Sequence, residues 1–128
     1  MAVDAKAVVI EFFECLGSQG PSRAIQLHMA PGFGWWASGM GQIEGQIEEL
    51  LGSLTSVFSD GPRFSVIGTT ADEKRVALEM MLSGILKNGS EYRNQYHFLF
   101  ELENGRIAQV REYCDTALLR ESLLPLLT

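Results

Sequence analysis

Two hydrophobic periods divide the chain, a helical one in the first half and a strand-like one in the second. In the first half apolar residues recur every three or four positions, as in helices that bury one face. They predict a helix over residues 4–17, a short helix over 22–29 capped by Ser22, and a long helix over 43–58. Glycines and prolines separate these helices, and Trp35-Trp36 is expected to form a short strand.

From residue 63 onward apolar and polar residues alternate, which indicates strands with one buried face. Strands are predicted over 63–70, 76–86, 91–102 and 106–114, with turns at Asn88-Gly89 and Glu103-Asn104-Gly105. Asp115 or Thr116 can cap a last helical segment that Pro125 cuts short. The order predicts an α+β domain in which three N-terminal helices pack on a curved antiparallel sheet. Such a cone leaves an internal pocket suited to a small molecule.

The turn at Asn88-Gly89 decides which side chains face this pocket. A two-residue turn places Glu79 opposite Phe98 and Met81 opposite Tyr96. The inner face then also carries Tyr92, Asn94 and Phe100. The outer face carries Val76, Leu78, Met80, Leu82 and His97, and its apolar patch predicts a homodimer through that face.

The second hairpin allows two registers. A two-residue turn at Asn104-Gly105 puts Glu112 on the outer face, whereas a three-residue loop with a left-handed Gly105 puts it on the inner face. We favour the second register, because such a loop needs glycine at that position. Val110 and Cys114 then join Glu112 on the inner face.

In that register two carboxyls, Glu79 and Glu112, enter one apolar pocket. Burial and mutual repulsion raise the pKa of such groups toward neutrality, where a carboxyl can act as general acid or base. Tyr96 and Asn94 can orient the polar end of a ligand, and the wall is formed by Phe12, Trp35, Met81, Phe98, Val110 and Cys114. Alternatively, each glutamate lies on the surface or in an ion pair with an arginine, and Trp35 only packs the core.

Composition narrows the partners and the location. The 128 residues fit a single domain, residues 1–128, and a net charge of −6 argues against nucleic acid or an anionic membrane as a partner. Cys15 and Cys114 could pair but are expected to be free thiols in a reducing cytoplasm. We expect neither a signal peptide nor a membrane span. His28 and His97 without clustered carboxylates predict no metal site, and proton transfer alone needs no cofactor.

Several motifs resemble one family. An aromatic strand, Tyr92-Arg93-Asn94-Gln95-Tyr96-His97-Phe98-Leu99-Phe100-Glu101, precedes Asn104-Gly105-Arg106-Ile107 and Val110-Arg111-Glu112-Tyr113-Cys114-Asp115-Thr116. Together with Trp35-Trp36 before Gly39, and Gly45 ahead of the long helix, they resemble the SnoaL-like branch of the nuclear transport factor 2-like superfamily over nearly the whole chain. The resemblance implies the cystatin-like cone, and relatives that include ketosteroid isomerases, limonene epoxide hydrolases and polyketide cyclases.

The catalytic sets of those relatives are incomplete in this chain. Glu112 matches the last Asp of the epoxide hydrolases' Asp-Arg-Asp set and Glu79 lies at or beside the first, but Ala77 stands in place of the arginine. At the ketosteroid isomerase positions, only Tyr96 can still donate a hydrogen bond to a substrate oxygen. Two hypotheses follow: an enzyme that moves protons with Glu79 or Glu112, and a module that binds a small ligand or a second copy without catalysis.

Overall fold

The structure is a computed structural model that describes residues 4–127. Its helices are α1 (Ala5–Gln19), α2 (Pro21–His28), α3 (Ile47–Ser56) and α4 (Thr116–Leu118), followed by a π-helical turn, η1 (Leu119–Leu123), and a 3-10 turn, η2 (Leu124–Leu126). Its strands are β1 (Met29–Ala37), β2 (Gly41–Ile43), β3 (Arg63–Ala71), β4 (Arg75–Ile85), β5 (Glu91–Glu103) and β6 (Arg106–Cys114). The predicted α+β class and the order of its main elements are confirmed.

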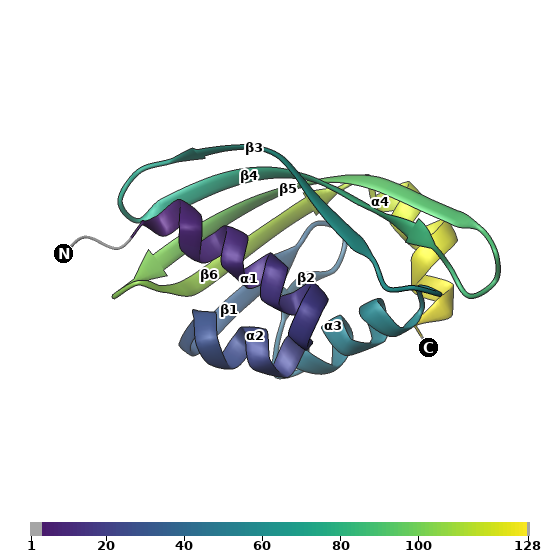
Figure 1. Cartoon of the computed structure of the whole chain (residues 1–128), viewed down its shortest axis with the longest axis horizontal. Coiled ribbons are helices and arrows are strands. Elements are labelled where there is room, and N and C mark those ends of the chain that lie inside the picture. The colour runs from purple at the N-terminus through teal and green to yellow at the C-terminus, as the bar shows by residue number, and fades with distance from the viewer. Residues whose placement is uncertain (1–3, 128) are drawn as a thin grey trace.

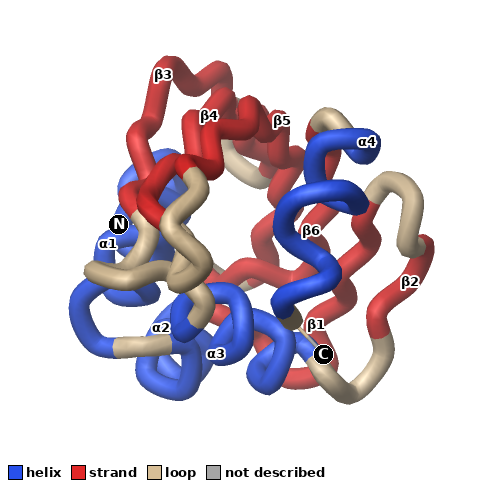
Figure 2. Tube along the Cα trace, turned by 90° about the vertical axis from the view of Figure 1, so that its right-hand side faces the viewer, coloured by secondary structure: helices blue, strands red, loops and turns tan. Residues whose placement is uncertain are grey.

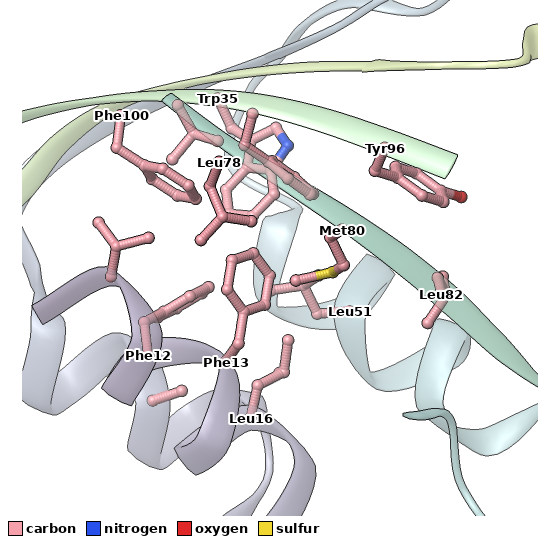
Figure 3. Packing of buried hydrophobic residues seen from close by; sticks show 14 of the residues in the cluster. Phe12, Phe13, Leu16, Trp35, Leu51, Leu78, Met80, Leu82, Tyr96 and Phe100 are labelled. Carbon is pink, nitrogen blue, oxygen red and sulfur yellow. The ribbon is translucent and has the colours of Figure 1, made fainter. Parts of the chain in front are cut away.

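The strands form one curved sheet in the order β2-β1-β6-β5-β4-β3. β3 to β6 make the predicted antiparallel meander, whereas β1 runs parallel to β6. Figure 1 shows α1, α2 and α3 on one side of this sheet, with the C-terminal segment at one end. Side chains of α1 point toward the strands in Figure 3, and the Phe13 ring lies 5.2 Å from that of Phe98, centroid to centroid. This aromatic layer joins the helices to the sheet.

The helix starts are set by capping and by proline. The Asp4 side chain accepts hydrogen bonds from the backbone N–H groups of Lys6 and Ala7, so α1 begins at Ala5. Ser22 was predicted to cap α2, but Pro21 occupies the first turn and makes that role impossible.

β1 contains the predicted strand at Trp35-Trp36 but begins earlier, over residues predicted to be a helix end and a break, and β2 ends at Ile43, the predicted start of the long helix. Pro31 and Gly32 lie between Met29 and Gly34, where the pairing of β1 with β6 is interrupted, and a strand tolerates them at such a site. The segment Gly41–Ile43 pairs with β1, so the long helix starts only at Ile47.

The first hairpin closes with a three-residue loop, which inverts the predicted faces of β4. The Leu86 N–H donates to the Ser90 carbonyl, and the Gly89 N–H donates back to the Leu86 carbonyl, with Gly89 at φ 88°. A turn followed by a left-handed glycine is a known hairpin closure of this length. Leu78 therefore lies opposite Phe98.

Because of this shift by one residue, several predictions for β4 are wrong. Glu79 lies opposite His97 and is exposed, and Met81 is half-buried on the same outer face. Both were predicted to enter the pocket, which is wrong. The patch that was expected on the outer face, Val76, Leu78, Met80 and Leu82, is buried in the core instead. The residues from which the homodimer was predicted are therefore not available at the surface of the sheet.

Glu112 faces inward, as predicted, but the hairpin reaches this register by a different route from the predicted three-residue loop. The turn at Asn104-Gly105 has only two residues, both with positive φ. The register then shifts by one between Glu101 and Leu102, where Ala108 is the extra residue of a bulge. Beyond the bulge Phe98 pairs with Glu112.

Candidate functional site

A cavity of about 70 Å³ lies between the sheet, α1, α3 and the C-terminal segment. A water molecule needs roughly 10–15 Å³ of such space, so the cavity has room for about five waters. Figure 2 shows the C-terminal helical segment and α3 at the same end of the molecule. Four leucines of that segment close this end of the cavity: Leu119, Leu123, Leu124 and Leu127. The site is therefore small and covered by the last residues of the chain.

Three polar groups belong to the residues that line this apolar space. They are the Trp35 indole N–H on β1, the Tyr96 hydroxyl on β5 and the Glu112 carboxyl on β6. Of the lining residues in the described part of the chain, Glu112 is the one acid, and none is a lysine, an arginine or a histidine. An anionic ligand would find no counter-charge in the cavity.

The Glu112 carboxyl is held by one oxygen and free at the other. Trp35 Nε1 donates a hydrogen bond to Glu112 Oε1 over 2.9 Å. In residues 4–127 each fully buried side-chain oxygen and nitrogen has a hydrogen-bond partner. In the same part of the chain no hydrogen bond engages Glu112 Oε2, so this oxygen keeps some accessible surface and can meet a ligand. The residue thus keeps some accessible surface although its carboxyl is surrounded by apolar side chains.

Burial raises the pKa of Glu112 to about 7, while the hydrogen bond from Trp35 acts in the opposite direction. The larger effect is the loss of hydration, which disfavours the charged form. A carboxyl with this pKa is divided between acid and base forms at neutral pH, as proton transfer in both directions requires.

Stacked rings form the wall next to this carboxyl. The Tyr96 and Phe98 rings lie nearly parallel with centroids 5.9 Å apart, and Trp35 meets Phe98 edge-on at 6.4 Å. Burial also raises the pKa of Tyr96 far above its ordinary value, so its hydroxyl remains a neutral hydrogen-bond donor.

Comparison with known proteins identifies the family of this fold. A family model described as a SnoaL-like domain matches residues 9–110. The chain belongs to the SnoaL-like domain family. A search of curated proteins finds no match.

Solved structures similar to this SnoaL-like domain carry several enzyme names. AclR from Streptomyces galilaeus, a hydroxylase candidate, is 18% identical with a TM-score of 0.79, over 94% of this chain and 82% of that one. An LEH-like epoxide hydrolase from M. tuberculosis is 20% identical with a TM-score of 0.74, over 94% and 90%. A SnoaL-like polyketide cyclase candidate from Jannaschia sp. CCS1 is 17% identical with a TM-score of 0.73, over 91% and 92%. At these identities the likeness shows the shared fold and not the reaction.

The site residues expected from the sequence separate into three groups. Trp35, Tyr96, Phe98 and Glu112 line the cavity of the SnoaL-like domain. Phe12, Asn94, Val110 and Cys114 are not among the lining residues, and they support that lining from the core or from its margin. Glu79 and Met81 lie on the opposite face of the sheet.

The supporting residues act through their neighbours. Phe12 packs against Trp35 with ring centroids 6.3 Å apart. Asn94 is bonded to Tyr92 and to the backbone of Asp115. The half-buried Cys114 thiol has its pKa raised to about 11, chiefly by burial, so it is a poor nucleophile.

Sequence reasoning missed most of the apolar lining. Phe13 rather than Phe12 reaches the cavity, and Met80 takes the place expected for Met81. The C-terminal leucines were recognised as helical but not as part of the site. Their spacing, with apolar residues at 119, 123, 124 and 127, is the one signal that could have identified a buried face there.

Proposed function

We propose that this SnoaL-like domain is a cofactor-free acid–base enzyme that acts on a small, mostly apolar molecule carrying a carbonyl, hydroxyl or epoxide oxygen. The observation that carries the proposal is Glu112. It is one carboxyl in an apolar cavity, with a pKa of about 7, one oxygen bonded to Trp35 and the other available. These are the properties of a general base that works near neutral pH.

The simplest reaction that fits is proton transfer next to a carbonyl group. Glu112 Oε2 takes a proton from the carbon beside the carbonyl, and the electron pair moves onto the carbonyl oxygen. Tyr96 lies diagonally across the strand pair from Glu112, roughly 7–8 Å away at the backbone, so it can donate to that oxygen. Return of the proton to another carbon gives an isomer. Attack of the carbanion on a second carbonyl, followed by return of the proton to the new alkoxide, gives a ring.

Epoxide opening by a pair of acids is less well supported. Glu79 was the candidate for the second acid of such a mechanism, but Glu79 lies on the outer face of the sheet. A single carboxyl suits a reaction in which the proton that is taken is later returned, so isomerase or cyclase chemistry is favoured.

The proposal is tested by deuterium exchange. Purified protein in D₂O is mixed with a panel of small cyclic ketones, and incorporation at the carbon beside the carbonyl is followed by NMR. We expect Glu112→Gln to reduce the exchange rate by a factor of about 10² to 10⁴, the usual contribution of a general base. Glu79→Gln makes the same substitution on the outer face and should retain the wild-type rate. Equal rates for wild type and Glu112→Gln contradict the proposal.

The second candidate is a module that binds a small ligand without catalysis. It is favoured by the small size of the cavity and by its single carboxyl. Binding of the ketones without any exchange above the buffer rate would support this candidate and exclude the enzyme. The cytoplasmic location stays a prediction under both candidates.

A further inference from the structure

A buried hydrogen-bond chain runs from the start of α4 to the cavity, and its direction can be derived. Asn94 Nδ2 donates to the Asp115 carbonyl over 3.1 Å, and Asn94 Oδ1 accepts from the Asp115 N–H over 3.3 Å. A backbone N–H can only donate and a carbonyl can only accept. The two bonds therefore fix which end of the Asn94 amide is oxygen and which is nitrogen.

The fixed amide determines where the proton of Tyr92 goes. The second N–H of Asn94 Nδ2 donates to the Tyr92 hydroxyl over 2.8 Å. Tyr92 is fully buried, and in the described part of the chain the other hydrogen-bond partner of its hydroxyl is that of Tyr96, 2.9 Å away. A buried donor left unpaired costs roughly 1–3 kcal/mol. Tyr92 therefore donates to Tyr96, because Asn94 cannot accept at that position.

The same logic leaves the proton of Tyr96 unused by the hydrogen bonds among Asn94, Tyr92 and Tyr96. Tyr96 accepts from Tyr92, so its own O–H must point elsewhere, and of these three residues Tyr96 is the one that lines the cavity. The nearby Cys114 thiol interacts with this hydroxyl. Sulfur is a weak acceptor, so a ligand oxygen can take its place.

We propose that Asn94 and Tyr92 orient the Tyr96 hydroxyl as a hydrogen-bond donor into the cavity, so that the site selects ligands with a neutral oxygen acceptor. Asn94 and Tyr92 are positioning residues, since they reach a ligand only through Tyr96. An anion, by contrast, meets Glu112 without a counter-charge. The inference deepens the proposed function because it concerns the same cavity, but it is a statement about binding and not about turnover.

The test compares two ligands of the same shape, cyclopentanone and methylenecyclopentane, by NMR titration at pH 8. Tyr96→Phe removes the donor, and Asn94→Asp replaces the amide that orients it with a group that accepts when ionised. We expect each variant to weaken cyclopentanone binding by about threefold to tenfold, which is the net worth of one hydrogen bond. The affinity for methylenecyclopentane should change by less than a factor of two, which a loss of packing would not allow.

Asn88→Asp is the matched control. Asn88 lies in the exposed turn between β4 and β5, where its side-chain oxygen accepts from the Ser90 N–H, as an aspartate can. It should keep the wild-type preference. If Asn94→Asp does not fold, Tyr92→Phe removes the hydroxyl that orders Tyr96 and should also weaken ketone binding selectively.

Three results overturn the inference: no binding of cyclopentanone to the wild type, unchanged ketone affinity in the variants, or equal losses for both ligands. The wild type itself separates this inference from the proposed function. A wild-type protein that prefers cyclopentanone but shows no proton exchange above the buffer rate supports the inference and contradicts the enzyme.

Discussion

Glu112 makes the fold less stable whenever it is ionised. Its pKa is about 7 in the folded chain, against 4.5 for a free side chain, because burial disfavours the charge. The folded state therefore binds this proton more tightly than the unfolded state does. The stabilising contribution is fully present below the unfolded pKa and is lost as the pH rises through the folded pKa. At about 1.4 kcal/mol for each pKa unit, the loss amounts to about 3 kcal/mol.

Glu112→Gln should remove this pH dependence. Urea unfolding of the wild type and of the variant at pH 5 and pH 8 gives the difference in their free energies of unfolding. We expect the difference to shift by about 2–3 kcal/mol in favour of the variant at pH 8. Glu79→Gln, on the exposed face, should follow the wild type. A difference that does not change with pH would mean that Glu112 has an ordinary pKa.

Single residues were easier to predict from the sequence than the contact between them. Trp35 and Glu112 were both assigned to the pocket from strand alternation. Their hydrogen bond joins positions 77 apart, and it depends on the parallel pairing of β1 with β6. No short motif indicates that pairing, because Pro31 and Gly32 interrupt the sequence pattern that would identify the first half of β1 as a strand.

At the scale of elements, the two hairpins show why faces are harder to predict than strands. Both Asn-Gly turns were recognised, but the three-residue loop closes the first hairpin and the two-residue turn closes the second. A change of one residue moves every side chain of a strand to the other face. For β4 the apolar set Val76, Leu78, Met80 and Leu82 was the better guide, since the more apolar face of a strand turns inward.

The C-terminal segment is an element whose role follows from packing. Leu123 is almost fully buried and lines the cavity. Leu123→Ala should lower the free energy of unfolding by about 2–4 kcal/mol and enlarge the cavity. The enlarged site should bind cyclohexanone more tightly relative to cyclopentanone than the wild type does. Leu27→Ala, at an exposed position of α2, is the control and should change stability by less than about 0.5 kcal/mol. An unchanged ketone preference would show that the segment does not limit the ligand's size.

At the scale of the whole molecule, fold and family were predictable because they depend on many positions at once. The order of helices and strands survives an error in one turn, and the family match covers residues 9–110. The reaction depends on a few side chains within one fold that hosts many chemistries. The wrong face for Glu79 was therefore enough to change the expected mechanism from two carboxyls to one.

The outer face of the sheet still offers a surface for a second copy, though not the one first predicted. Arg111 lies over the Trp36 ring, 4.2 Å from its centroid, and bonds the Tyr113 hydroxyl over 3.1 Å. Tyr113 is 39% exposed and lies opposite His97 on β5. Aromatic side chains and arginine are the residue types enriched in protein interfaces, so this cluster supports a homodimer through the outer face.

Light scattering after size-exclusion chromatography tests that homodimer directly. We expect the wild type to elute with twice the mass of the chain and Tyr113→Glu to elute as a monomer, because two added carboxylates would face each other across a symmetric interface. Ile67→Glu adds the same charge at an exposed position of the edge strand β3, away from the cluster, and should remain dimeric. A wild-type monomer at high protein concentration contradicts the homodimer. The aromatic cluster would then act within a single chain, where Arg111 lies over the Trp36 ring and the Trp36 and Tyr113 rings meet with centroids 5.3 Å apart.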